Sequence, residues 1–289
     1  MPKAKTSLSP RDLARAVGVS ESSVKRWADD GLLESVRTAG GHRRIRMAEA
    51  VRFVRAAGME VLRPDLLGLG APAGGRGEVE PSAAALTEAI QRGDGAAACR
   101  MLVSAYVQGA SVSGLCDGPI RAALEDAGRW WKEGAEGIAL EHHAVDACVD
   151  ALMEIRAMIE VPKKARIAVG GAAAGDPYVL PSLMASVILA EAGFETMNLG
   201  ADVPTEALAS VIRSRSPDLV WRSFSVESSL STIRGDLAAL PRTKGRSYDV
   251  VVGGRGVARG LTLGDGSPVQ LFESMTELAG FAKARRPRR

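Results

Sequence analysis

The chain has 289 residues, of which 46% are hydrophobic, 25% charged and only 4% aromatic, and its net charge is +3. This length predicts two or three domains of roughly 100–150 residues each. No run of about 18 apolar residues occurs, and the N-terminal segment MPKAKTSLSP lacks the apolar core of a signal peptide, so we expect a cytoplasmic protein without a membrane span. Three widely separated cysteines favour neither a disulfide framework nor a zinc site.

The first segment, residues 1–68, is predicted to form a winged helix-turn-helix domain. Ser9 and the proline after it open a helix, PRDLARAVG, and Ser20 caps a second helix, ESSVKRWADDG. The helices are expected to end at Gly18 and Gly31. The stretch LLESVRTAGGHRRI then reads as two extended pieces around a Gly-Gly turn, a wing, and RMAEAVRFVRAAG as a third amphipathic helix.

Polar and basic side chains gather on the second helix and on the wing. The start of such a helix enters the major groove of DNA, glycines allow close approach to a phosphate, and arginines supply fixed forks of donors. We therefore expect double-stranded DNA as the partner. The expected contacts are Ser22, Ser23, Lys25, Arg26, His42, Arg43 and Arg44. The head resembles that of the MerR superfamily of transcription regulators, which implies a dimer on a palindromic or repeated operator.

The composition changes twice beyond the head. Residues 69–81 are rich in Gly and Pro, lack periodicity and read as a flexible linker. Residues 82–162 are Ala-rich and predict a bundle of about four helices, with breaks near RGDG, QGASVSG and KEGAEG. In residues 163–289 the runs ARIAVGG, ETMNLGA, DLVWRSF and DVVVGG alternate with helical stretches, which predicts a parallel α/β sheet. The fold class is therefore multidomain, α plus parallel α/β.

The predicted bundle contains two of the three histidines of the chain, His142 and His143, directly after Glu141. On a helix His142 shares a face with Leu152, whereas His143 faces two aspartates and should be solvated. Trp131 stands ten residues before Glu141. Taken alone, these residues also suit core aromatics and a hydrogen-bonded histidine.

The spacing W-x9-E-H resembles the bundle motif of cobalamin-binding, MerR-type light sensors (the CarH/LitR group). The resemblance implies that Trp131, Glu141 and His142 surround the upper-face group of adenosylcobalamin, with Ile138 as an apolar wall. In some family members a histidine follows the tryptophan and ligates cobalt after illumination. Lys132 stands there in this chain, and a protonated lysine cannot ligate a metal.

The stretch GGAAAGDPYVLPSLMAS follows a β-rich run and precedes a helical pattern, the arrangement of a ligand loop. With the later Ser-Phe-Ser and Gly-Gly it resembles the signature D-x-H-x-x-G, S-x-L, G-G of the cobalamin-binding Rossmann-like domain. The resemblance implies that the nucleotide tail of a base-off cobalamin enters the carboxyl edge of the sheet. It implies contacts from Asp176, Tyr178, Ser223, Ser225, Gly253 and Gly254.

Two positions of the first part of this signature, D-x-H-x-x-G, differ. Tyr178 replaces the histidine that would ligate cobalt, and a phenol with a pKa of about 10 is a poor ligand at neutral pH. Pro181 replaces a glycine. Three states of the site stay open: cobalamin without a protein ligand or with a weak Tyr178 contact, a heme or bilin with His142 or Tyr178 as metal ligand, and no ligand at all.

The sequence therefore predicts a transcription regulator, expected to be a repressor. It would form a homo-oligomer, a dimer or tetramer, whose assembly responds to a tetrapyrrole of the cobalamin type and to light. The alternative is a ligand-independent regulator whose α/β domain serves oligomerisation or binds a protein partner. No substrate domain, Ser-His-Asp order, metal cluster or phosphate loop is recognisable, so an enzyme is not expected.

Overall fold

The computed structural model describes residues 7–67, 82–130, 132, 134–241, 247–257 and 269–285. The chain divides into two compact units, Met1–Glu160 and Val161–Arg289. The predicted linker and Trp131 lie outside the described residues. Among the described residues, no helix has the length and apolar character needed to cross a membrane.

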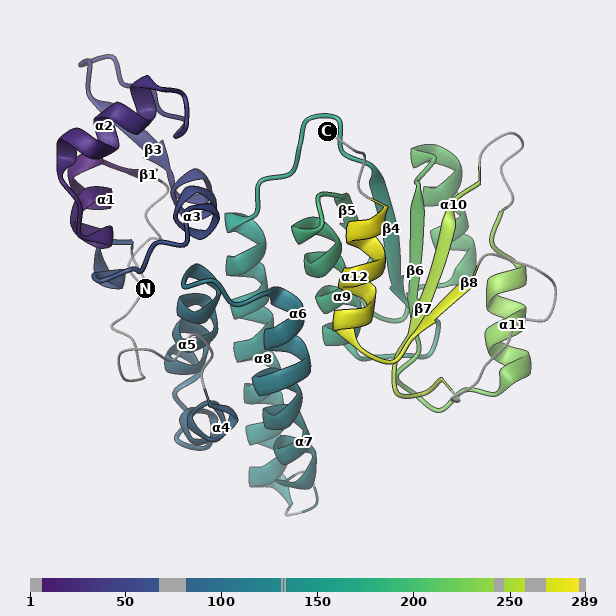
Figure 1. Ribbon diagram of the computed structural model, residues 1–289. Helices are drawn as coiled ribbons and strands as arrows, with labels where there is room; N and C mark the ends of the chain where they lie inside the picture. Colours follow the sequence, from purple (N-terminus) through teal and green to yellow (C-terminus); the bar gives the residue numbers. More distant parts are fainter. Residues whose placement is uncertain are drawn as a thin grey trace. The chain divides into compact units, whose positions relative to one another are not determined.

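The first unit begins with a small head of short helices and strands (Figure 1). Its elements are β1 (Ser7–Leu8), α1 (Pro10–Val17), α2 (Glu21–Asp29), β2 (Val36–Arg37), β3 (Arg43–Arg46), α3 (Met47–Ala56) and the 3-10 helix η1 (Pro64–Leu67). β3 pairs antiparallel with both β1 and β2. The predicted helix pair, wing and third helix are confirmed; β1 was not predicted, because two residues carry no periodicity.

The helix ends follow the capping residues of the sequence. The Ser9 hydroxyl oxygen accepts the N–H of Asp12 at 3.1 Å, and the Ser20 hydroxyl oxygen accepts the N–H of Ser23 at 3.1 Å. Each bond satisfies a backbone donor that the first turn of a helix leaves open. The cap of α1 is Gly18, as predicted.

The helical bundle completes the first unit. Its elements are α4 (Ala83–Gln91), α5 (Gly95–Val107), α6 (Val112–Leu115), the π-helix η2 (Cys116–Ile120), α7 (Arg121–Trp130) and α8 (Ala135–Met158). The long helix α8 packs against α5 and α7. The backbone between α6 and α7 bends at Gly118, whose ψ of -105° is not helical, immediately before Pro119. The three predicted breaks are confirmed.

The side chain of Arg55 contributes to the contact between the head and the bundle. α3 packs against α5 and α8, and the Arg55 guanidinium lies 3.9 Å from the ring centroid of Tyr106. The same guanidinium donates to the backbone carbonyls of Tyr106 and Ala110, the second at 2.8 Å. The Tyr106 carbonyl lies in the last turn of α5, and the Ala110 carbonyl lies just beyond that helix. The C-terminal end of a helix carries partial negative charge, so the guanidinium of Arg55 is favourably placed there.

The second unit is a parallel sheet with helices on both faces (Figure 1). Its elements are β4 (Ile167–Ala172), α9 (Val179–Glu191), β5 (Glu195–Asn198), α10 (Thr205–Arg215), β6 (Leu219–Ser223), α11 (Leu230–Ala238), β7 (Asp249–Gly253), β8 (Val269–Phe272) and α12 (Met275–Ala284). The strand order is β5-β4-β6-β7-β8, all parallel. The predicted parallel α/β architecture is confirmed, whereas β8 was not predicted.

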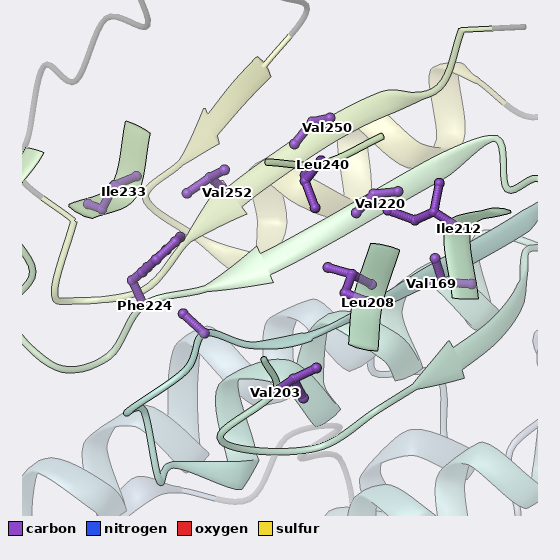
Figure 2. Packing of buried hydrophobic residues seen from close by; sticks show 11 residues of the cluster. Val169, Val203, Leu208, Ile212, Val220, Phe224, Ile233, Leu240, Val250 and Val252 are labelled. Atoms are coloured by element: carbon purple, nitrogen blue, oxygen red, sulfur yellow. The ribbon is translucent and has the colours of Figure 1, made fainter. Parts of the chain in front are cut away.

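One face of the sheet packs a continuous apolar cluster against α10 and α11 (Figure 2). The cluster contains Val169, Ala173, Val203, Leu208, Ile212, Val220, Phe224, Ile233, Leu240, Val250 and Val252.

The guanidinium of Arg222 has no exposed surface and lies 2.6 Å from the carboxylate of Asp236 on α11. It also donates to the carbonyls of Ala172 and Val203, at 3.0 Å each. A buried charge is tolerated when it is paired and hydrogen-bonded in this way.

A buried carboxylate holds the head together. Glu49 on α3 is fully buried, and its Oε1 accepts the backbone N–H of Glu34 at 2.7 Å. Arg52 donates from Nε to Oε2 at 2.5 Å and from Nη2 to Oε1 at 2.6 Å. Burial raises the pKa of Glu49, but the bonds from Arg52 and from the Glu34 N–H outweigh burial, and the pKa lies below its ordinary value. The charged form of Glu49 therefore stabilises the fold.

We predict that Glu49→Gln lowers the free energy of unfolding by about 1–3 kcal/mol at pH 7, because Arg52 loses its anionic partner. Since the folded-state pKa is depressed, this stabilisation is present above the unfolded-state pKa and lost as pH falls through the folded-state pKa. Urea unfolding at pH 7 and at acidic pH measures both effects, with the exposed Glu60→Gln as control. Equal stability of Glu49→Gln and wild type at pH 7 would contradict this role.

Candidate nucleic-acid interface and candidate ligand edge

The first candidate site is an open groove between the wing and the first two helices of the head, with a volume of about 480 Å³. The groove is lined by Ser9, Pro10, Arg11, Glu21, Lys25, Asp29, Arg37, Gly41, His42, Arg43 and Arg44. Basic side chains outnumber carboxylates along it. Such a surface attracts a polyanion.

The predicted contacts on α2 lie in its first two turns. The hydroxyl oxygens of Ser22 and Ser23 lie 2.8 and 2.9 Å from the hydroxyl oxygen of the capping residue Ser20. The ammonium group of Lys25 forms an ion pair of 2.8 Å with Glu21, one turn earlier. All of these partners are local, so the side chains can exchange them for DNA contacts without disturbing the core.

The two wing arginines differ in their surroundings. Arg43 donates from Nη1 to the backbone carbonyl of Lys25 at 2.9 Å and from Nη2 to Oδ1 of Asp29 at 2.6 Å. Its side chain is only 15% exposed. Arg44 is exposed, and within the described residues its side chain has no hydrogen bond or ion pair. The difference follows from the strand, on which successive side chains point to opposite faces.

Sequence reasoning missed two basic residues of the groove, Arg11 and Arg37. Arg37 lies on β2 directly opposite Arg43 on β3, a pairing that only the register of the hairpin reveals. The predicted contacts Arg26 and His42 are both exposed. The head therefore presents a larger basic surface than the sequence motif indicated.

The second candidate site is the carboxyl edge of the parallel sheet. The strand order reverses between β4 and β6, and open α/β sheets bind ligands at such a switch point. The predicted residue Asp176, only 2% exposed, follows β4. Its Oδ2 accepts the N–H of Ser225 at 2.5 Å and its Oδ1 the N–H of Tyr178 at 3.1 Å. The structure thus brings these three predicted residues together.

The ring of Tyr178 lies at the surface of this edge and is 41% exposed. The Arg255 guanidinium lies 5.0 Å from the ring centroid, and Nε of Arg255 donates to the Ser225 carbonyl at 3.3 Å. Arg255 was not predicted as a site residue. It follows the Gly-Gly pair directly, one position beyond the end of the sequence motif.

The two predicted serines differ from the rest of the edge because the hydroxyl oxygens of Ser223 and Ser225 are buried without a hydrogen-bond partner among the described residues. Buried polar atoms nearly always have a partner, so these hydroxyls suit a polar group of a ligand or a water molecule.

The glycine pair offers less room for a ligand than expected. A Cβ on Gly254, whose φ is +116°, would lie 2.2 Å from the carbonyl oxygen of Phe224. Neighbouring backbone therefore fills the space at Gly254.

On the α9 face of the sheet, the space beside the switch point is filled by Trp221 of β6, which is 2% exposed. A Cβ on Gly170 of β4 would lie 2.3 Å from Cδ2 of the indole. The indole N–H donates to the Ser182 hydroxyl of α9 at 3.0 Å. In the sequence this tryptophan is recognisable only as part of a predicted strand, the run DLVWRSF.

These residues do not fit a cobalamin that a protein imidazole holds on its lower face. The position that would supply the imidazole is Tyr178, and its ring faces Arg255. Both oxygens of Asp176 accept backbone N–H groups, so the carboxylate orders this edge without a ligand. The serine hydroxyls remain compatible with a polar ligand held in another way.

The predicted bundle residues lie on α8. Ile138 and Glu141 are half-buried, and His142 is exposed. The expectation that His143 is solvated is wrong. Nε2 of His143 accepts the N–H of Gly95 at 3.0 Å, because α5 begins against this part of α8.

The described residues contain no group of His, Cys, Asp and Glu side chains that could hold a metal ion. Cys99, Cys116 and Cys148 form no disulfide among the described residues. Burial raises the pKa of Cys99 and of Cys148 to about 12 in each case. Neither thiol therefore supplies a thiolate nucleophile at neutral pH.

Known proteins are similar to this chain both in the head and in the fold of the remaining chain. Residues 9–45 match the MerR family regulatory protein family. The chain resembles the monomethylamine corrinoid protein of Methanosarcina barkeri, with 19% identity, a TM-score of 0.54 and coverage of 69% of this chain and 95% of that one. Because the second unit is less than half of the chain, this likeness of fold includes part of the first unit. No curated protein matches the chain.

Two further solved structures are similar at lower scores. The methanol:cobalamin methyltransferase complex MtaBC of Methanosarcina barkeri has 17% identity and a TM-score of 0.37, with 92% of each chain covered. A cobalamin-binding protein of Desulfitobacterium hafniense DCB-2 has 18% identity and a TM-score of 0.35, with 71% of this chain and 98% of that one covered.

We predict that Tyr178→His does not create a site with an imidazole on cobalt, because Arg255 lies against the ring at position 178 and Trp221 fills the space beside the switch point. The visible spectrum of the desalted protein after incubation with cobalamin measures this. Tyr178→Phe is the control for removal of the phenol. Stoichiometric retention of cobalamin by Tyr178→His, but not by Tyr178→Phe or wild type, would overturn the prediction.

Proposed function

We propose that this chain, whose N-terminal head is a MerR-type helix-turn-helix domain, is a transcription regulator that binds double-stranded DNA through α2 and the wing. The observation that carries the proposal is the basic groove between α2 and the wing, inside the segment that matches the MerR family. In helix-turn-helix proteins the second helix of the unit contacts base edges in the major groove. Phosphate contacts from basic side chains fix its register on the duplex.

Regulation would pass through self-association. A dimer places two heads on one operator, and linking two weak DNA contacts increases avidity by about 10²–10⁴ without any new contact. The second unit would be the regulatory part, because it has the fold of a corrinoid protein and carries no DNA-binding motif in its described residues. Repression by occupancy of a promoter follows most simply from such an assembly.

Arg55 supports a coupling between the head and the rest of the first unit. Its guanidinium stacks on Tyr106 and bonds to the carbonyls at the end of α5. A change in the position of α5 therefore acts directly on α3. This contact gives the bundle a physical means to influence the DNA-binding head.

A second candidate function is control by a flat tetrapyrrole: a cobalamin held without a protein ligand on cobalt, a heme or a bilin. The buried hydroxyls of Ser223 and Ser225, which lack partners among the described residues, favour it. With adenosylcobalamin, light would be the natural signal. Without any ligand, the second unit would serve oligomerisation or bind a protein partner.

Selection of the full-length chain on a random duplex library tests the proposed function. We expect enrichment of one palindromic or repeated sequence, because a symmetric dimer presents two identical heads. Arg26→Ala, an exposed change on α2, should weaken binding to that sequence about tenfold or more, at roughly 1–3 kcal/mol per base or phosphate contact. Failure to enrich any sequence above the input library would refute the proposed function.

Retention of a chromophore tests the second candidate. The protein is incubated in the dark with adenosylcobalamin, with heme or with biliverdin, desalted, and its visible spectrum is recorded. We expect one of the three to be retained at a stoichiometric level and to change the mass measured by sedimentation. Loss of all three on desalting would rule out tetrapyrrole control and leave the ligand-independent assembly.

A further inference from the structure

We propose that the arginines around the wing groove have two different roles in the DNA binding proposed above. Arg43 is a positioning residue that fixes the wing against α2. Arg11, Arg37 and Arg44 are the residues that contact DNA phosphates. The inference rests on the proposed function and assigns individual roles within it.

The role of Arg43 follows from its bonds. One guanidinium reaches two points of α2, the Lys25 carbonyl at 2.9 Å and the Asp29 carboxylate at 2.6 Å. These partners lie 18 and 14 residues earlier in the chain, so the bonds connect the wing strand to the helix across the groove. A planar guanidinium that donates to two fixed acceptors has one preferred orientation. The angle between wing and α2 therefore depends on Arg43.

The charge of Arg43 is already balanced. Asp29 stands against it, and the arginine side chain is largely buried. A phosphate approaching Arg43 would also approach the Asp29 carboxylate, which is 63% exposed and repels it. A phosphate contact at Arg43 would therefore add little to the free energy of DNA binding.

The other three arginines have no such partner. Arg11, Arg37 and Arg44 belong to the lining of the groove, and within the described residues their side chains form no ion pair. Arg37 stands directly opposite Arg43 across the hairpin, and like charges in this position repel each other. Asp29 neutralises Arg43, which leaves Arg37 as the charge that an incoming anion would balance. When α2 enters the major groove of DNA, the groove between α2 and the wing faces the duplex. The phosphates of the duplex are the anions that would balance this charge.

Salt dependence separates the two roles. Each lysine or arginine that contacts a phosphate adds about 0.9 to the slope of log K against log salt concentration. We expect Arg11→Ala, Arg37→Ala and Arg44→Ala to weaken binding and each to reduce this slope by about one. Arg43→Ala should weaken binding to the selected operator about tenfold or more, with the slope unchanged. Its affinity for unrelated duplex should change less, because position matters only for the specific complex.

Two further variants protect the test from a general loss of folding. Arg43→Lys keeps the charge but loses the fork of donors, so it should resemble Arg43→Ala rather than wild type. Asp29→Ala should lower the ratio of specific to unrelated affinity in wild type and have no further effect in Arg43→Ala, because the two side chains act as one unit. Circular dichroism melting confirms that each variant is folded at the temperature of the binding measurement.

Titration by fluorescence anisotropy at several salt concentrations gives the slope and both affinities. A slope reduced by about one in Arg43→Ala, with recovery in Arg43→Lys, would overturn the positioning role. Unchanged slopes in the three other alanine variants would overturn the phosphate contacts. Absence of salt-dependent DNA binding by wild type would instead refute the proposed function itself, so the two failures are distinguishable.

Discussion

The carboxyl edge of the sheet depends on one buried carboxylate. Asp176 accepts backbone N–H groups from both loops that flank the switch point, at Tyr178 and at Ser225. Loop N–H groups beside a sheet have no ladder partner, and a buried donor without a partner is costly. The bonds to Asp176 satisfy them and hold the two loops together. Both oxygens take part in these bonds, so the carboxylate fixes the shape of this edge before any ligand binds.

In the head, two charged side chains likewise fix short segments of backbone by hydrogen bonds. Glu49 holds the N–H of Glu34, just before the wing, and Arg43 holds the wing against the end of α2. Neither contact adds apolar area to the core. Each one fixes the position of a short segment that has too few residues to bury a face of its own. A small DNA-binding head can thus keep a defined groove with only short strands on one side of it.

The sequence was sufficient wherever a signal is local. Ser9 and Ser20 mark helix starts because their hydroxyls bond to backbone three residues on, and the β-rich runs of the second unit mark parallel strands. It was insufficient wherever the partner lies far along the chain. The bonds of Arg43 to α2 and of His143 to the start of α5 cross 14 residues or more, and no pattern in the neighbourhood of either residue announces them.

At the carboxyl edge of the sheet, too, the sequence predicted which residues lie together but not how they pack. The motif placed Asp176, Ser223 and Ser225 at one edge of the sheet, and the structure brings Asp176 to Ser225. The motif could not indicate that Trp221, two residues before Ser223, turns its indole toward α9, or that the backbone of Phe224 fills the space at Gly254. Both depend on packing between segments, not on residue type at the motif positions.

Within the first unit, α3 connects the wing with the bundle. This ten-residue helix carries Glu49 near its start and Arg55 near its end. Glu49 bonds to the segment before the wing, and Arg55 bonds to the end of α5. A helix of this length is a stiff rod of about 15 Å, so a displacement at one end moves the other. α3 therefore links the bundle and the wing mechanically, and neither of its two contacts involves a residue that we assign to DNA binding.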